Sequence, residues 1–500
     1  MRVSPELDSF IERYDANVAQ VVWTTLIADL ETPVSAMLKL ADGRANAFLL
    51  ESVEGGATRG RYSIIGMKPD LIWRFYKSKA EINRNARTDP DAFLPTDTPP
   101  LESLRALIAE SQIDLPAEVP PMASGLFGYM GYDAIRLFED IPDDNPDTLG
   151  IFDGILMRPT VVCVFDSIED LVTVVTPVYP REGLSAAAAL DAARTRLADL
   201  VADFERSLPY RREGGASVEP LPEPVSNTGR EAYHDMVRRA VEYIHAGDAF
   251  QVVPSHRLAL PFKLPPFAFY RSLRRLNPSP FLFFFDFGEY AIVGSSPEIL
   301  VRLRDDVVTI RPLAGTRKRG ATSEEDKALA EELLADPKER AEHLMLLDLG
   351  RNDVGRVAEI GTVSVKEQFV IERYSHVMHI ASHVEGRLAP GKDVVEGLFS
   401  GFPAGTVSGA PKVRAMEIID ELEVSRRGVY AGAVGYISAN AMDTCIALRT
   451  ALVKDGTVYI QAGGGVVADS DPEDEWQETM NKARALIRAA EEAVRFAARG

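Results

Sequence analysis

The chain has few cysteines, no long uncharged apolar run and fewer basic than acidic residues. Only Cys163 and Cys445 are available among 500 residues, so a disulfide framework is excluded and a reducing cytoplasm is expected. The most apolar run, Pro280–Phe285, stops at Asp286 and is far shorter than the roughly 20 residues that span a membrane. The first residues carry acids where a secretory signal is apolar, which predicts that such a signal is missing.

The charge balance excludes a further class of function. Lys and Arg number 55 while Asp and Glu number 75, so the net charge is −20. This charge repels phosphate backbones and anionic lipid surfaces, so neither a nucleic acid nor a membrane is expected as a partner. An anionic small substrate would need a local positive site.

What is present is the mixture of an ordinary globular protein. Apolar residues make up 46% and charged residues 26%, and the length predicts two to four domains or one unusually large one. The stretch 208–226 is rich in proline and glycine and has little apolar periodicity, which predicts a connector. We therefore predict an N-terminal part at 1–210, a connector at 211–227 and a C-terminal part at 228–500.

Apolar patterning and turn signals predict both strands and helices. The segment 156–178 is expected to form a strand pair around 166–170, and 184–204 a helix. The dipeptide Asp455-Gly456 predicts a hairpin that joins 445–454 to 457–462. A capping residue or a proline in the first turn marks three more helix starts: Thr228–Glu231 (in a helix ended by Gly247), Asp336–Glu339 and Asp471–Pro472.

Two of these helices carry carboxylates at helical spacing. Glu475, Glu478 and Lys482 share one face, and so do Glu339 and Glu342. Two carboxylate pairs could hold a hard dication such as Mg²⁺, which takes one or two carboxylates together with water and a substrate oxygen. The alternative is a solvated helix surface, with Glu339 acting as a capping partner.

The predicted hairpin places Arg449 opposite Ala462. Its guanidinium would then project near Gly463–Gly465, where backbone N–H groups can approach an anion closely. This arrangement predicts a carboxylate site. The alternative is that the three glycines form a bulge and Arg449 lies on the surface.

Three histidines have the spacing of metal ligands on a helix. The residues around His376, His379 and His383 are β-branched, however, and predict a strand on which His376 points away from the other two. A zinc site is therefore not expected, and a single histidine acting as acid or base stays open beside a packed core histidine. Ser408 lies in no G-x-S-x-G turn, which disfavours a serine hydrolase.

Several long strings resemble the chorismate-utilising enzymes, and most closely the anthranilate synthase component I family. Over 228–490 the matching strings are Ala314–Arg317, Ala341–Asp348, Arg351–Asp353, Phe402–Lys412, Asp443–Arg449 and Gln461–Val466. In the N-terminal part the shorter strings Leu49–Ser52 and Arg61–Ser63 match. Many long strings in the same order are more specific than any single glycine loop.

The resemblance implies a fold, a reaction and a partner. The fold would be a large α/β sandwich of antiparallel sheets flanked by helices, with the active site in a cleft of the C-terminal part. The reaction would turn chorismate and ammonia into anthranilate and pyruvate, for tryptophan biosynthesis. Neither cysteine has the glycine-flanked setting of an amidotransferase nucleophile, so a separate glutamine amidotransferase subunit is expected to supply ammonia in a hetero-oligomer.

The resemblance also implies roles for individual residues. The Mg²⁺ ligands would be Glu342 and Glu478, with Glu339 and Glu475 acting through water. The residues that bind substrate would be Tyr430, Arg449, Gly463, Gly464, Gly465 and Lys482. The catalytic group would be Glu298, His379, Thr406 and Gln251.

Within the catalytic group, Glu298 would protonate the departing C4 hydroxyl, which requires a carboxyl that stays neutral. His379 would serve the loss of pyruvate, and Thr406 would line the same pocket. Isochorismate and salicylate synthases have a lysine base where this chain has Gln251, and a glutamine cannot deprotonate water, so amination is favoured. Ala314 stands where aminodeoxychorismate synthases have a nucleophilic lysine, which argues against that alternative. A non-catalytic amino-acid-binding relative is the other alternative.

The N-terminal part would be regulatory and would bind tryptophan as an inhibitor. Leu49–Ser52 resembles the inhibitor-binding string of the family, and Asn277–Leu282 resembles a second strip of the same pocket. Glu51 would meet the ammonium and Ser52 would add a hydrogen bond. The residues around the indole would be Pro280, Phe281 and Leu282. The alternative is a core strand at Pro280–Phe285 packed on Leu49–Leu50.

Overall fold

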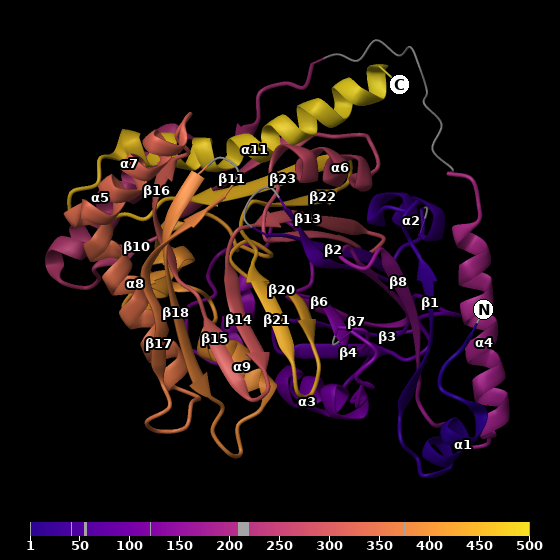
Figure 1. Cartoon of the computed structure of the whole chain (residues 1–500). Helices are drawn as coiled ribbons and strands as arrows, with labels where there is room; N and C mark the ends of the chain where they lie inside the picture. The colour runs from indigo at the N-terminus through magenta and orange to yellow at the C-terminus, as the bar shows by residue number, and fades with distance from the viewer. Residues whose placement is uncertain are drawn as a thin grey trace.

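The computed structural model describes residues 2–41, 43–54, 58–120, 122–208, 220–374 and 377–499. Most strands join one large, branched, antiparallel sheet, and helices cover its outer faces (Figure 1). This architecture confirms the predicted fold class. Among the described residues, no helix is long and apolar enough to cross a membrane.

The first two hundred residues supply eight strands of the large sheet. These strands are β1 (Gln20–Ile27), β2 (Ala47–Glu54), β3 (Thr58–Tyr76), β4 (Lys79–Asn83), β5 (Leu94–Pro95), β6 (Leu126–Met130), β7 (Gly154–Asp166) and β8 (Leu171–Val178). The helices are α1 (Leu7–Asp15), α2 (Pro33–Leu40), α3 (Pro100–Glu110), the 3-10 helix η1 (Tyr132–Leu137) and α4 (Ala186–Phe204). The predicted strand pair is β7 with β8, and the predicted helix is α4.

The remaining strands and helices carry the candidate site. The strands are β9 (Val225–Ser226), β10 (Gln251–Val252), β11 (Ser255–Pro261), β12 (Phe281–Asp286), β13 (Tyr290–Ser296), β14 (Ile299–Arg304), β15 (Val307–Ile310), β16 (Leu313–Lys318), β17 (Ser364–Arg373), β18 (Val377–Arg387), β19 (Gly409–Ala410), β20 (Ala433–Ile437), β21 (Met442–Ile446), β22 (Thr450–Lys454) and β23 (Thr457–Gly463). The helices are α5 (Arg230–Ala246), α6 (Pro266–Leu276), α7 (Ser323–Ala335), α8 (Pro337–Gly355), α9 (Val394–Ser400), η2 (Gly405–Val407), α10 (Lys412–Leu422) and α11 (Pro472–Arg499).

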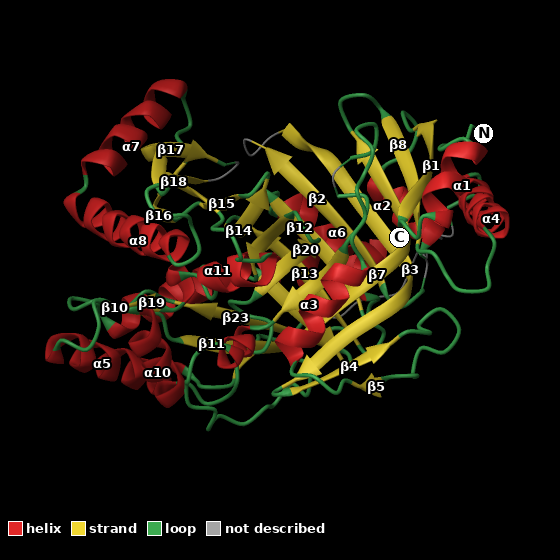
Figure 2. Ribbon diagram, turned by 90° about the horizontal axis from the view of Figure 1, so that it is seen from below, coloured by secondary structure: helices red, strands yellow, loops and turns green. Residues whose placement is uncertain are grey.

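Helix α11 lies between two other groups of helices. In Figure 2, α7 and α8 cover β16–β18, while α5 and α10 lie across α11 from them together with β10 and β19. α8 packs against β16 and β18, and α11 packs against α5, α6 and β23. The two helices that carry the predicted metal ligands are therefore supported by different parts of the sheet.

Strand pairs cross the predicted division of the chain. β2 pairs with β12, so that Leu49 lies opposite Phe284, and β6 pairs with β20. Most of the predicted connector, 211–219, lies outside the described residues, and its end forms the short strand β9, which pairs with β11. The division into a regulatory and a catalytic part stays a prediction, but the two parts share one sheet.

Two predicted helix starts form as expected. The carboxylates of Asp336 and Asp471 each accept the backbone N–H groups two and three residues further on, at the starts of α8 and α11. Pro337 occupies the first position of α8. The C-terminal end of α5 at the left-handed Gly247 also matches the prediction.

The capping box predicted at Thr228–Glu231 is wrong. Helix α5 begins at Arg230, after Gly229 with a φ of 81°. The hydroxyl oxygen of Ser226 accepts the backbone N–H groups of Thr228 and Gly229 instead. A tight turn anchored by Ser226, and not a Thr228 side-chain cap, therefore leads into α5.

The hairpin at Asp455-Gly456 forms in the predicted register. Its ladder does not reach Arg449, because Arg449 has a φ of 47° and turns the chain between β21 and β22. Ala462 pairs with His256 of β11 instead. The predicted pairing of Arg449 with Ala462 is therefore wrong, and the single strand predicted at 445–454 is broken in two.

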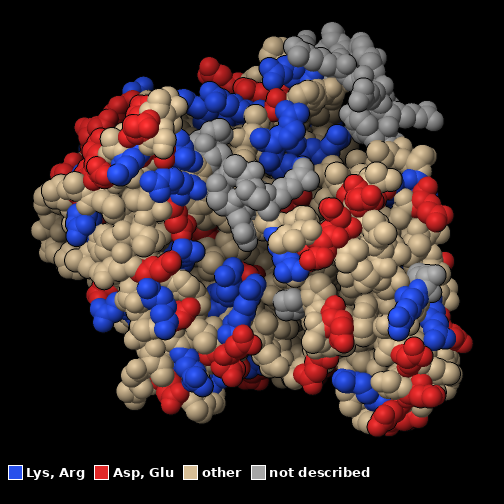
Figure 3. All heavy atoms as spheres, viewed as in Figure 1, with Lys and Arg blue, Asp and Glu red and all other residues tan. Residues whose placement is uncertain are grey.

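Charged side chains cover the surface unevenly. On the face seen in Figure 3, acidic and basic side chains are intermingled, and basic side chains gather near the top, in the region where Figure 1 shows α6 and α11. The overall charge of −20 is therefore not spread uniformly over that face.

Candidate active site

Glu298 is a buried carboxyl in the short connection between β13 and β14. It is 6% exposed, and the Thr406 hydroxyl of η2 lies 3.3 Å from both of its carboxyl oxygens. Burial raises the pKa of Glu298 to about 8. Because the charged form is disfavoured in this setting, the side chain holds a proton at neutral pH and can donate it.

His379 lies on β18 as a neutral imidazole. Its Nδ1 atom is 2.8 Å from the carbonyl oxygen of Gly315 and 3.1 Å from the Thr316 hydroxyl. A carbonyl oxygen can only accept, so the geometry assigns the ring proton to Nδ1 and leaves a lone pair on Nε2. Burial lowers the pKa of His379 to about 4. Nε2 is therefore available as a proton acceptor at neutral pH.

Arg449 presents a largely desolvated cation. Burial lowers its pKa, while Tyr374 and Glu298 act in the opposite direction. It forms no ion pair with any residue that the structure describes. A guanidinium without an anion is costly to bury, and a carboxylate from a ligand would compensate it through charge-assisted hydrogen bonds.

Tyr430 and Gly463–Gly465 lie close to one another. A Cβ on Gly463 would come within 2.9 Å of the Tyr430 hydroxyl. A Cβ on Gly464 would lie 2.5 Å from Oε2 of Glu475, and one on Gly465 would lie 2.8 Å from Nε2 of Gln251. The missing side chains thus let the backbone lie against three predicted site residues.

The carboxylates of α8 and α11 repel one another. Burial raises the pKa of Glu342, and Glu339 and Glu478 raise it further. Burial also raises the pKa of Glu475 to about 7, with Glu478 adding to the shift. Oε2 of Glu475 is buried without a hydrogen-bond partner among the described residues. A cation here would remove the repulsion and give this oxygen a partner.

Other members of the predicted metal set already have partners. Arg317 donates to Glu339 at 3.0 Å, and Lys482 contacts Glu478 at 2.7 Å. Nε2 of Gln251 donates to Glu342 at 3.3 Å, which links β10 to α8. Within the described ranges, no three Asp, Glu, His or Cys side chains are arranged to hold a metal ion. The all-oxygen donor set nevertheless fits Mg²⁺, which keeps waters among its ligands.

Lys482 joins the carboxylates of α11 to Gly463. Its ammonium donates to the carbonyl oxygen of Gly463 at 2.9 Å and lies next to Glu478. The structure therefore brings the predicted residues together as contacting sets. These sets are Glu298 with Thr406; Gln251 with Glu342; and Glu478, Lys482, Gly463 and Tyr430.

The five predicted inhibitor-binding residues line one cavity of about 720 Å³. They are Glu51, Ser52, Pro280, Phe281 and Leu282. The carboxylate of Glu51 already has partners, since two nitrogens of Arg274 donate to it at 2.7 Å and the Tyr270 hydroxyl donates at 2.5 Å. An ammonium at Glu51 would therefore meet a carboxylate that already accepts hydrogen bonds from Arg274 and Tyr270.

Sequence reasoning missed several residues at these places. Thr316 lies inside a matched string, so the resemblance could have drawn attention to it. Tyr374 packs the edge of its ring against His379, with centroids 5.5 Å apart, and also lines the large cavity. No spacing pattern marked Tyr374, Arg274 or Tyr270, because their partners come from distant segments.

Comparison with known proteins identifies the family of the chain. Residues 46–488 match the family of chorismate binding enzymes. The chain belongs to this family. It is 62% identical over 493 residues to anthranilate synthase component 1 of Cereibacter sphaeroides, covering 98% of each chain. It is 47% identical over 475 residues to the component 1 of Pseudomonas putida, covering 93% of each chain.

Solved structures give the same result. The crystal structure of anthranilate synthase component I from Streptococcus pneumoniae superposes with a TM-score of 0.74 at 38% identity, covering 86% of this chain and 92% of that chain. The menaquinone-specific isochorismate synthase of Escherichia coli superposes with a TM-score of 0.71 at 21% identity, covering 97% and 98%, and shares the fold. The resemblance that the sequence strings suggested is confirmed.

Proposed function

We propose that this chain converts chorismate and ammonia into anthranilate and pyruvate, as the anthranilate synthase component 1 relatives are named to do. The observation that carries the proposal is a buried, protonated Glu298 and a neutral His379 that both lie within electrostatic range of Arg449. The first step needs an acid and the second needs a base. Their pKa values are shifted in the directions that provide both at neutral pH.

In the first step the substrate loses a hydroxyl and gains nitrogen. Arg449 and Tyr430 would hold the enolpyruvyl carboxylate. Glu298 donates its proton to the hydroxyl at C4, which leaves as water, while ammonia bonds to C2 and the ring double bonds shift. Gln251 has no basic atom, and ammonia brings its own lone pair, so no base is needed to activate the nucleophile.

In the second step the aminated ring loses pyruvate and becomes aromatic. Nε2 of His379 would take the proton from C2, and the bond between C3 and the enolpyruvyl oxygen breaks. The bond electrons leave with the oxygen, so the released group is the enolate of pyruvate, which takes up one proton on carbon and becomes pyruvate. The hydrogen bonds from Nδ1 to Gly315 and Thr316 fix the ring so that the lone pair stays on Nε2.

We infer that Mg²⁺ binds between α8 and α11. Glu342 and Glu478 would be direct ligands, and Glu339 and Glu475 would act through water. Support comes from the unpartnered oxygen of Glu475 and from the raised pKa values of Glu342 and Glu475, which burial causes first and neighbouring carboxylates increase. When bound, the ion would supply the positive charge that holds the ring carboxylate.

A second subunit would supply ammonia from glutamine. Cys163 and Cys445 are buried and free, and burial raises the pKa of both thiols, so neither resembles a glutaminase nucleophile. The relatives carry the name component 1, which supports a partner that binds glutamine. Two unpaired thiols also support a reducing, cytoplasmic setting.

We further infer that tryptophan inhibits the reaction from the 720 Å³ cavity. The cavity combines apolar walls at Pro280, Phe281 and Leu282 with polar groups at Glu51 and Ser52. This combination suits an indole with an amino-acid head group. Inhibition requires that tryptophan favour a state with weak affinity for chorismate.

The proposal is tested by incubating the purified chain with chorismate, Mg²⁺ and ammonium. Anthranilate and pyruvate should form in equal amounts, and glutamine in place of ammonium should give neither. A para-amino product would indicate an aminodeoxychorismate synthase. Unchanged chorismate would indicate a non-catalytic relative, and either result would refute the proposal.

A further inference from the structure

Two adjacent buried arginines in the connection between α10 and β20 enter different networks. The side chain of Arg426 is 5% exposed and that of Arg427 is 1% exposed. Arg426 pairs with aspartates of the N-terminal part, whereas Arg427 pairs with Glu423 at the end of α10. The two residues thus share a type, a location and a degree of burial, and they differ in what they hold.

Arg427 uses every nitrogen of its guanidinium. Nε donates to both oxygens of Glu423 at 3.1 Å, and Nη2 donates to Glu423 at 2.6 Å. Nη1 donates to the carbonyl oxygen of Val407 at 2.7 Å, and Nη2 donates to that of Val253 at 2.6 Å. The guanidinium also lies 5.4 Å from the ring centroid of Tyr430.

Each of these contacts ends beside a residue of the proposed site. Val407 follows Thr406, whose hydroxyl contacts Glu298. Val253 stands two residues after Gln251, which contacts Glu342. Buried carbonyl groups need a donor, and the planar fork of an arginine fixes the direction of each bond. One side chain therefore contacts three segments of the proposed site. They carry Thr406 beside Glu298, Gln251 beside Glu342, and Tyr430.

Glu423 extends the same network to Gly463. Its carboxylate accepts the backbone N–H and the hydroxyl of Ser255, both at 2.8 Å. Ser255 pairs with Gly463 between β11 and β23. The ion pair therefore also fixes the strand against which Tyr430 and Lys482 lie.

We propose that Arg427, held by Glu423, is a positioning residue that sets the relative placement of the Thr406, Gln251 and Tyr430 segments. The inference rests on the proposed function, because it assigns Arg427 a role in that reaction. Arg427 touches no reacting atom and acts through the loops that its guanidinium holds.

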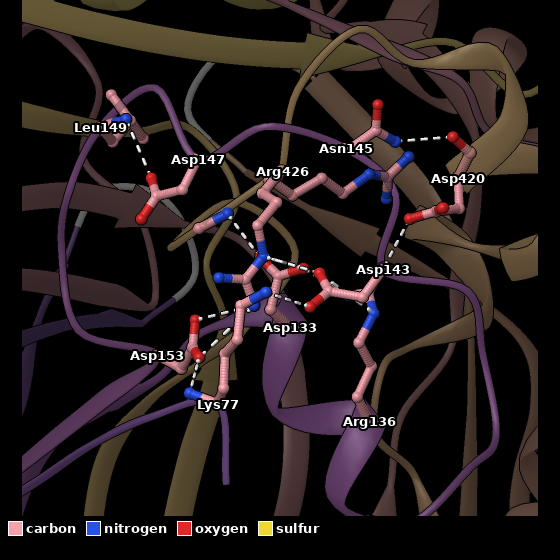
Figure 4. Close-up of polar contacts among 12 residues, drawn as sticks. Lys77, Asp133, Arg136, Asp143, Asn145, Asp147, Leu149, Asp153, Asp420 and Arg426 are labelled. Carbon is pink, nitrogen blue, oxygen red and sulfur yellow. Dashed lines mark hydrogen bonds and ion pairs between the residues drawn. The ribbon is translucent and has the colours of Figure 1, made fainter. Parts of the chain in front are cut away.

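Arg426 provides a matched control. Figure 4 shows its guanidinium among Asp133, Asp143 and Asp153, in a network that also includes Arg136. Among the described residues, none of these partners belongs to the proposed site. Replacing Arg426 removes an adjacent buried arginine whose own side-chain partners are these aspartates, one of which, Asp133, also accepts the backbone N–H of Gly428.

The test compares Arg427→Lys with Arg426→Lys. Lysine keeps the charge but cannot reproduce the fork. Chorismate consumption is measured per folded molecule, well below the unfolding temperature of each variant. Arg427→Lys should lower kcat by about tenfold or more and raise KM for chorismate, since small displacements of catalytic groups are costly. Arg426→Lys should stay within about twofold of the parent in both constants.

If Arg427→Lys does not fold, Glu423→Gln serves instead, because it keeps Arg427 and an acceptor oxygen while removing the charge. It should change kcat and KM in the same directions. Parent values of both constants in the Arg427 or Glu423 variant, or equal losses in the Arg426 control, would overturn the inference. Following chorismate consumption keeps this outcome distinct from failure of the proposed function, which shows as a wrong product from the parent chain.

Discussion

Replacing Glu298 by glutamine tests the acid and its energetics together. With a pKa of about 8, Glu298 is about 90% protonated at pH 7, whereas a carboxyl at 4.5 would be about 0.3% protonated. Burial thus raises the fraction of proton-bearing enzyme about 300-fold. Glutamine keeps the shape of the side chain but has no proton to donate, so kcat should fall by roughly 10²–10⁴.

The same pKa shift costs stability. The pKa of Glu298 is higher in the folded than in the unfolded state. The folded state is therefore most stable, with respect to this group, below pH 4.5, and it loses stability as the pH rises to about 8. At pH 7 the loss is about 3 kcal/mol. Glu298→Gln removes this ionisation and should unfold at a higher temperature than the parent at pH 7, less the cost of burying the amide.

The assay measures kcat between pH 6 and pH 9.5 by anthranilate fluorescence, and thermal unfolding at the same pH values. The parent should lose activity as the pH rises through about 8, and Glu298→Gln should lack this alkaline limb. The control is Glu289→Gln, which makes the same substitution in the exposed turn between β12 and β13. Parental kcat, or an unchanged alkaline limb, in Glu298→Gln would refute the reasoning.

Three further substitutions test the other assigned roles. His379→Ala should still consume chorismate but release an aminated compound that keeps the enolpyruvyl group, detectable by chromatography; chorismate left unreacted would place His379 in the first step. Glu478→Gln should abolish Mg²⁺-dependent turnover without changing thermal unfolding, since Glu478 is half exposed. Turnover that persists at the parental Mg²⁺ requirement argues against the ligand assignment. Ser52→Phe should fill part of the cavity and block tryptophan inhibition while leaving uninhibited activity near normal; undiminished sensitivity to tryptophan would move the inhibitor site elsewhere.

Local chemistry explains which parts of the fold were predictable. Asp336 and Asp471 cap helices through backbone groups two and three residues away, so their sequence neighbourhood contains all that is needed. Thr228 failed as a cap because α5 begins only after Gly229, and Ser226, placed by the pairing of β9 with β11, accepts the N–H groups of Thr228 and Gly229. Tertiary structure overrode the local capping pattern at this helix start.

In the candidate site, too, local spacing was predictable and contacts between distant segments were not. Helical spacing placed Glu475 and Glu478 on one face, but nothing in that spacing shows that Oε2 of Glu475 is buried without a partner. The partners of Arg427 at Val253 and Val407 lie on separate loops and are joined to it only by folding. A carbonyl acceptor carries no side-chain signature, so such contacts leave no trace in residue patterns.

The acid and the large cavity share a single stretch of backbone. Pro297 and Ile299 line the cavity, while Glu298 between them faces Thr406. The hydroxyl of Ser279 donates to the carbonyl oxygen of Ser296 at 2.6 Å. This hydrogen bond links the cavity wall at Pro280–Leu282 to the backbone just before Pro297. A ligand that displaced Pro280–Leu282 would therefore act on the backbone that carries Glu298. If tryptophan binds there and weakens chorismate binding, as proposed, chorismate should weaken tryptophan binding by the same factor, because such coupling is reciprocal.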